Sequence, residues 1–194
     1  MQKGQGLKLA DILVTIVIAI VFGIIYKLWG PMYDLLKISN LQVEQLSYGM
    51  WFIAGPVAFL IVRKPGVALL AETAAALFSL VLGSEYSLQA LTYGIAQGIG
   101  AELVFLAFGY KRFTLPVTLL AALGTTFFSF VLDTYYSYLT DLSTGIIVLQ
   151  IIMRSIGAIL ITGFFAFYLV RALEKTGVTS LVRPVSTEDY KSLN

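Results

Sequence analysis

Four ionisable residues stand inside long apolar stretches of this sequence: Glu72, Glu102, Asp133 and Arg154. A charged side chain at the centre of a membrane helix costs about 2.5–3.5 kcal/mol on insertion scales, so each of them needs a partner. One base cannot pair with three acids. Arg154 either forms a structural ion pair, with Glu102 or Asp133, or serves a functional site, and we expect at least one acid to be protonated, solvated or neutralised by something bound.

A polar stripe at helical spacing runs through residues 126–140. Its members share one helix face and are Thr126, Ser129, Asp133, Tyr136 and Thr140. Two further pairs, four residues apart, also share a face: Tyr93 with Gln97, and Gln150 with Arg154. Polar faces of membrane helices meet a cavity or other polar groups, so these residues predict an internal site.

Aromatic residues add to this site near one end of the apolar stretches. Trp51 either anchors a helix at the membrane interface or stacks on a ligand ring, and the sequence leaves both open. Aromatic faces, amides and an acid together suit a small, flat, partly polar ligand. The predicted substrate-binding residues are Tyr48, Trp51, Glu72, Glu85, Tyr93, Gln97, Asp133, Tyr136, Gln150 and Arg154.

The elements that must position these residues are membrane helices. The 194-residue chain is 58% hydrophobic and 12% charged, and a hydrocarbon core about 30 Å thick needs roughly 20 helical residues. Backbone groups in lipid must bond within their own segment, so we predict an all-α membrane protein with six transmembrane helices in residues 1–173 and a polar tail in 174–194. The six predicted spans are Leu9–Trp29, Leu46–Val62, Gly66–Gly83, Leu88–Gly109, Leu115–Leu139 and Thr144–Arg171.

Basic residues predict the orientation of the bundle. They gather before the first span, after the second, fourth and sixth spans, and are sparse elsewhere. By the positive-inside rule both termini are cytoplasmic. The longest connection, from Gly30 to Gln45, then lies outside, where it is either an amphipathic surface segment or a lid over the site.

Several kinds of chemistry are excluded by composition. The chain has no Cys and no His, so disulfides, thiolate catalysis, serine–histidine hydrolysis and His-containing metal sites are impossible. It also lacks a G-x-x-x-x-G-K-[ST] motif, so it does not bind ATP through a Walker loop. We predict a protein that is not an enzyme, with no metal, no cofactor and no nucleic acid partner.

Six helices in about 190 residues, with both ends inside and a long first outer loop, resemble an S component of an energy-coupling factor (ECF) transporter. The run from Tyr93 to Phe105, YGIAQGIGAELVF, resembles the YkoE family of these components. The resemblance extends through the whole chain. It implies a bacterial multi-pass cell membrane protein that captures thiamine or its hydroxymethylpyrimidine precursor outside and works with a T subunit and ATPase subunits.

The resemblance also implies a docking face for the T subunit on the first helix, formed by the small residues Ala19 and Gly23. An alternative is a self-sufficient transporter coupled to protons or ions, with Glu72, Glu102 and Asp133 as ion sites. The sequence does not separate thiamine from its precursor, because an aminopyrimidine suits Glu or Gln and a thiazolium suits an acid excess with aromatic faces.

Overall fold

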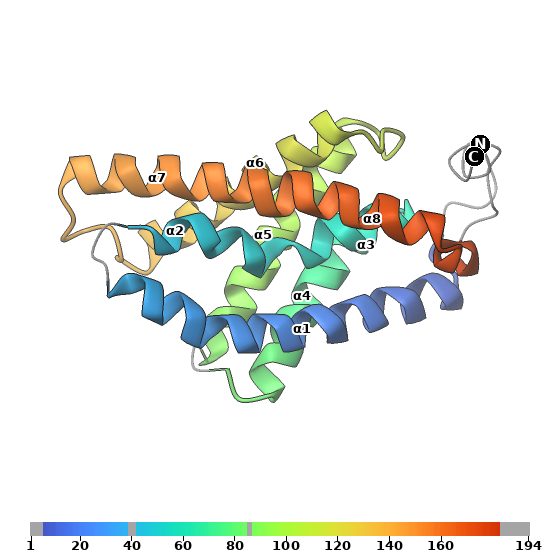
Figure 1. Ribbon diagram of the computed structural model, residues 1–194, viewed down its shortest axis with the longest axis horizontal. Coiled ribbons are helices and arrows are strands. Elements are labelled where there is room, and N and C mark those ends of the chain that lie inside the picture. The colour runs from blue at the N-terminus through green and yellow to red at the C-terminus, as the bar shows by residue number, and fades with distance from the viewer. Residues whose placement is uncertain (1–5, 39–41, 85–86, 183–194) are drawn as a thin grey trace.

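The computed structural model describes residues 6–38, 42–84 and 87–182, which form helices joined by short connections (Figure 1). No strand occurs in these ranges, so the all-α class is confirmed for them. In chain order the elements are α1 (Leu9–Lys37), α2 (Glu44–Ser47), the 3-10 helix η1 (Tyr48–Phe52), α3 (Ala54–Val62), α4 (Val67–Val81), α5 (Ser87–Ala107), α6 (Leu115–Tyr135), α7 (Thr144–Ala158), the π-helix η2 (Ile159–Phe165), α8 (Ala166–Lys175) and the 3-10 helix η3 (Val178–Leu181).

Five helical stretches in the described residues are long and apolar enough to cross a membrane. α2, η1 and α3 together form one of them, and α7, η2 and α8 form another, which appears as one continuous rod in Figure 1. The predicted third span is shorter than expected, because α4 is apolar but has only 15 residues. At 1.5 Å per residue, this helix is about 22 Å long.

α1 differs from the prediction at its C-terminal end. It runs through Pro31 and ends at Lys37, so the prediction that the first span stops at Trp29 is wrong. A proline removes only one backbone donor, and the helix beyond it is held by tertiary packing of the buried Tyr33. Residues 30–37 therefore continue α1 as helix and do not form a loop. Residues 39–41 of that connection lie outside the described residues.

The second span is broken in its middle. Ile53 separates η1 from α3, and Pro56, in the first turn of α3, has no N–H to continue the helix from Phe52. η1 packs closely on the α7–η2 rod, since a Cβ on Gly49 would lie 3.0 Å from the carbonyl oxygen of Gly157. This break presents the residues of η1 to the interior of the bundle.

Ion pairs hold together one end of the bundle. Lys64 pairs with Asp11, and Arg63 Nη2 lies 2.9 Å from Glu174 Oε1. The start of α1, the α3–α4 turn and the end of α8 therefore meet, and Figure 1 shows the start of α1 and the end of α8 at the same end of the bundle. Glu174 lies inside α8, so the predicted boundary after residue 173 falls within a helix. Residues 183–194 of the predicted tail lie outside the described residues.

The small residues of α1 pack inside the bundle. Ala19 has no exposed surface, and a Cβ on Gly23 would lie 2.6 Å from Phe78 Cβ and 2.9 Å from the carbonyl oxygen of Ala75 in α4. The prediction that Ala19 and Gly23 face a partner subunit is therefore corrected, because this face is covered by α4. The exposed face of α1 carries large aliphatic residues such as Val17.

This packing predicts the effect of adding one methyl group. Gly23→Ala should lower the melting temperature of the detergent-solubilised chain, because overpacking a tight contact costs about 1–3 kcal/mol. Gly145→Ala is the matched control, since Gly145 in α7 has no atom within 4 Å of an added Cβ. That variant should be neutral or more stable. Equal melting temperatures for the two variants would contradict internal packing of Gly23.

Candidate ligand-binding site

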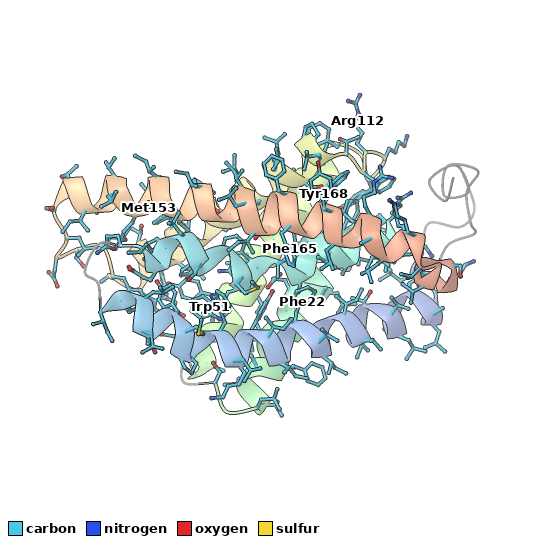
Figure 2. All side chains as sticks on the ribbon, in the orientation of Figure 1. Phe22, Trp51, Arg112, Met153, Phe165 and Tyr168 are labelled. Carbon is cyan, nitrogen blue, oxygen red and sulfur yellow. The ribbon has the colours of Figure 1, made fainter. Side chains whose placement is uncertain are left out.

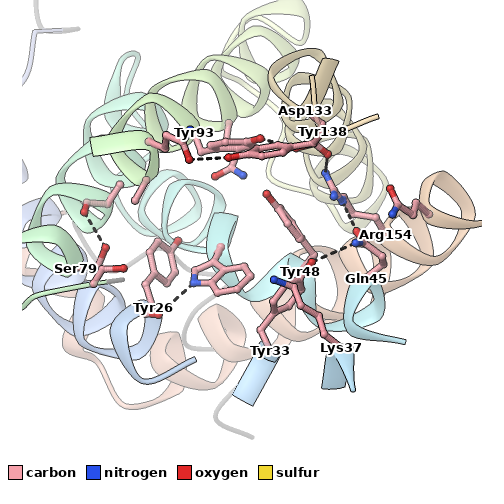
Figure 3. A pocket seen from close by; sticks show the side chains of 18 of the residues that line it. Tyr26, Tyr33, Lys37, Gln45, Tyr48, Ser79, Tyr93, Asp133, Tyr138 and Arg154 are labelled. Atoms are coloured by element: carbon pink, nitrogen blue, oxygen red, sulfur yellow. Dashed lines mark hydrogen bonds and ion pairs between the residues drawn. The ribbon is translucent and has the colours of Figure 1, made fainter. Parts of the chain in front are cut away.

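Figure 3 shows a cavity of the bundle, which has a volume of about 380 Å³. Its lining residues belong to the end of the bundle opposite the Arg63–Glu174 pair. Residues from the C-terminal halves of α1 and α4, the N-terminal half of α5, and from α2, η1, α6 and α7 line it. Ligand pockets span about 300–1,000 Å³, so this cavity has the volume for a small organic molecule.

One wall of the cavity is aromatic. The ring centroid of Trp51 lies 4.7 Å from that of Tyr33 and 5.4 Å from that of Tyr48, both in edge-to-face geometry. The indole lies between η1 and α1 (Figure 2), where its N–H donates to the carbonyl oxygen of Tyr26 at 3.1 Å. Trp51 is therefore part of the cavity wall, which is the geometry that its ligand-stacking alternative requires.

A second wall, which adjoins the first at Tyr48, is organised around a buried ion pair. Arg154 is 2% exposed. Its Nη1 donates to Asp133 Oδ2 at 2.7 Å and to Ser129 Oγ at 2.9 Å, and its Nε donates to Gln45 Oε1 at 2.8 Å. The second Asp133 oxygen accepts from the hydroxyl of Tyr93 at 2.5 Å. Of the two pairings that the sequence left open for Arg154, the structure shows the one with Asp133.

Cations already occupy two tyrosine faces. The Arg154 guanidinium carbon lies 3.8 Å from the ring centroid of Tyr48, and Lys37 Nζ lies 4.8 Å from that of Tyr33. The described lining holds Lys37 and Arg154 against Asp133 alone. The acid excess expected from the sequence is therefore absent from this part of the cavity.

The other two acids bind at helix N-termini. Glu72 has no exposed surface, and its carboxylate accepts from the Tyr26 hydroxyl at 2.6 Å and from Gly55 N at 2.8 Å. Glu102 accepts from Gly66 N at 2.6 Å and Leu69 N at 3.1 Å. The unpaired N–H groups and partial positive charge of a helix start stabilise a carboxylate. The two acids that do not pair with Arg154 therefore have partners within the protein itself.

Seven of the ten predicted binding residues come together at the cavity. Two do not: Glu72 lies behind the wall, and Tyr136 stacks behind Tyr93 with ring centroids 6.0 Å apart. Glu85 lies outside the described residues. The predicted residues that line the cavity are Tyr48, Trp51, Tyr93, Gln97, Asp133, Gln150 and Arg154.

Sequence reasoning missed part of the lining. Tyr26, Tyr33 and Lys37 follow one another at offsets of 7 and 4 along one face of α1. This spacing could have found them if the helix had been continued past Pro31. Gln45, which also lines the cavity, falls in the predicted first connection and lies in α2. Tyr138 falls in the predicted fifth span, but α6 ends at Tyr135 and Tyr138 lies in the turn that follows.

Gln97 offers a free side-chain amide to the cavity. Its side chain is 2% exposed and faces the cavity, yet its amide makes no hydrogen bond to any described residue. By contrast, the Gln150 amide donates to Gln42 Oε1 at 2.7 Å. The amide of Gln97 is thus available to a group in the cavity.

Comparisons with known proteins agree with this architecture. Residues 10–128 match the model of the family described as the ABC-type cobalt transport system, permease component. A protein of Bacillus subtilis (strain 168), named as the HMP/thiamine permease protein YkoE, is 35% identical over 173 residues, which cover 88% of this chain and 86% of the relative. The crystal structure of an S-component of an ECF transporter superposes with a TM-score of 0.91 at 32% identity, covering 97% of this chain and 96% of that chain.

The fold is that of a membrane transporter component, a class of protein that carries no enzymatic activity. The chain belongs to the YkoE family of S components of ECF transporters. It is a multi-pass protein of the cell membrane.

The buried ion pair predicts a strong and coupled effect on stability. Asp133→Asn or Arg154→Met alone should each destabilise the chain by about 3–5 kcal/mol, because one buried group loses its counter-charge. The double variant should lose clearly less than the sum of the two. Melting temperatures of all four proteins in detergent measure this coupling. Additive losses would contradict a direct pair.

Proposed function

We propose that this chain is the membrane-embedded substrate-binding subunit of an ECF-type importer, which captures thiamine or its hydroxymethylpyrimidine precursor from outside and delivers it inward with T and ATPase subunits. The relative's name supports the ligand class, and the cavity supports a ring-shaped ligand. The proposal includes six membrane spans, with α4 as the short third one and both termini in the cytoplasm. The bundle end with Arg63 and Lys64 then faces inward, and the cavity faces outward.

The single observation that carries the ligand class is the free amide of Gln97 beside an aromatic wall. An amide presents a donor and an acceptor side by side. An aminopyrimidine presents the complementary pair, a ring nitrogen acceptor next to an amino donor. Stacking on Trp51 or the tyrosines would hold the ring plane, and Gln97 would recognise its edge.

The matched family model is named for cobalt transport, but the donor set here suits an organic ligand better. The chain has neither His nor Cys, the side chains that bind divalent transition metals best. The cavity acid Asp133 is bound to Arg154 and Tyr93. These contacts support a heterocycle and not a metal ion as the cargo.

The alternative of a self-sufficient ion-coupled transporter receives less support. It assigns ion sites to Glu72, Glu102 and Asp133, and each of these carboxylates is bound to groups of the protein itself. Because the pyrimidine ring is common to thiamine and its precursor, the site described here accommodates both within the proposal.

We expect the isolated, detergent-solubilised chain to bind thiamine or hydroxymethylpyrimidine in isothermal titration calorimetry. Transport in proteoliposomes should require the T and ATPase subunits together with ATP. Biotin serves as the unrelated vitamin control. Binding of biotin but of neither pyrimidine compound would overturn the ligand assignment, and uptake by the chain alone would favour the ion-coupled alternative.

Gln97→Leu should weaken pyrimidine binding by about five- to 150-fold, because a ligand polar group then loses its partner at a cost of about 1–3 kcal/mol. Gln150→Leu is the matched control, since the amide of Gln150 already has a partner in Gln42. Its effect on the dissociation constant should be several-fold smaller. Equal losses in titrations of the two variants would show that Gln97 has no special role.

A further inference from the structure

η1 places two cavity aromatics, Tyr48 and Trp51, immediately before the break in the second span. A helix that begins anew after such a break has first N–H groups with no partner in their own helix. In α3 these groups belong to Ala54 and Gly55, which are buried in the bundle. The orientation of η1 therefore depends on what binds the start of α3.

Two buried side chains bind the start of α3. Ala54 N donates to the hydroxyl oxygen of Tyr26 at 3.0 Å, and Gly55 N donates to Glu72 Oε2 at 2.8 Å. The Tyr26 hydroxyl itself donates to Glu72 Oε1 at 2.6 Å. Both oxygens of the Glu72 carboxylate are thus engaged, and the side chain connects α1, α3 and α4.

Tyr26 extends this arrangement to the cavity. Its ring lines the cavity, and its carbonyl oxygen accepts the indole N–H of Trp51 at 3.1 Å, drawn as a dashed line from Tyr26 in Figure 3. Glu72 does not line the cavity. It contacts a residue that fixes the indole and also holds the helix start that follows the indole.

We propose that Glu72 is a positioning residue of the ligand site, which sets the orientation of Trp51 through Tyr26 and the start of α3 without touching the ligand. This inference rests on the proposed function for its ligand. In this role Glu72 neither contacts the substrate nor binds an ion, which were the two roles considered for it from the sequence. A carboxylate suits this role because it accepts two hydrogen bonds at once, from a hydroxyl and from a backbone N–H.

The chain offers a matched control in Glu102. Like Glu72, Glu102 caps a helix other than its own. It accepts from two backbone N–H groups at the start of α4, far from the aromatic wall. Glu72→Gln and Glu102→Gln make the same chemical change, since an amide keeps one acceptor and replaces the other with a donor. If Glu72 served only stability, the two variants would behave alike.

The first measurement needs no ligand. In a Trp29→Phe background, Trp51 is the only tryptophan. Glu72→Gln should shift the emission maximum of Trp51 and reduce its near-ultraviolet circular dichroism. Glu102→Gln should lower the melting temperature but leave both signals unchanged. Unchanged signals in Glu72→Gln, or the same change in both variants, would overturn the proposal.

The second measurement is affinity. Glu72→Gln should raise the dissociation constant of the pyrimidine ligand by about tenfold, and Glu102→Gln should leave it within about twofold of the wild-type value. If wild-type protein binds neither pyrimidine compound, the proposed function fails, and the spectroscopic comparison still decides the positioning role. If both variants lose affinity equally, the positioning role fails while the proposed function stands.

Tyr26→Phe provides a second route if Glu72→Gln does not fold. It keeps the ring in the cavity wall and removes only the hydroxyl that links Glu72 to Ala54. It should change the Trp51 signals in the same direction as Glu72→Gln. In the double variant the loss of affinity should be smaller than the sum, because both substitutions break one network. Wild-type signals in Tyr26→Phe, or additive losses, would argue against coupling through Tyr26.

Discussion

Backbone N–H groups at helix starts inside an apolar bundle have no water to bind, and the arrangement of this protein depends on how they are satisfied. Glu72 from α4 binds the start of α3, and Glu102 from α5 binds the start of α4. Each carboxylate belongs to a different helix from the one it caps. A helix boundary and a helix–helix contact are therefore fixed by the same bond, which allows the second span to break beside the cavity without leaving an unpaired donor at Gly55.

The ion pair of Arg154 and Asp133 holds the helices of the other cavity wall together. It joins α7 to α6, and through Gln45 and Tyr93 it reaches α2 and α5. Removing one partner would leave an uncompensated buried charge, which is far more costly than losing a surface pair. The polar groups that shape the cavity are thereby held in place before a ligand arrives, and Gln97 stays available because it takes no part in this network.

Close approach of helices makes the remaining contacts possible. A Cβ on Gly157 would meet the backbone of Leu46 at 2.0 Å, so the α7–η2 rod can lie directly against α2. In the π-helix η2, the Thr162 hydroxyl donates to the carbonyl oxygen of Gly49 at 2.7 Å and supports η1 from the side opposite the cavity. Small residues on α1 act likewise against α4, which explains why Ala19 and Gly23 lie inside the bundle.

The sequence by itself determined the helical membrane class and seven of the residues that line the cavity, because apolar length and helical spacing are local properties of the chain. It placed Gln97, Asp133 and Arg154 on inward faces correctly. Only the tertiary structure decided that Arg154 pairs with Asp133, that Glu72 caps α3 behind the cavity wall, and that α1 continues past Pro31 to bring Tyr33 to the site. Spacing fixes which face of its own helix a side chain occupies. The partner across the bundle depends on contacts between residues far apart in the sequence, such as that of Tyr26 with Glu72, 46 positions away, and these contacts form only when the helices pack.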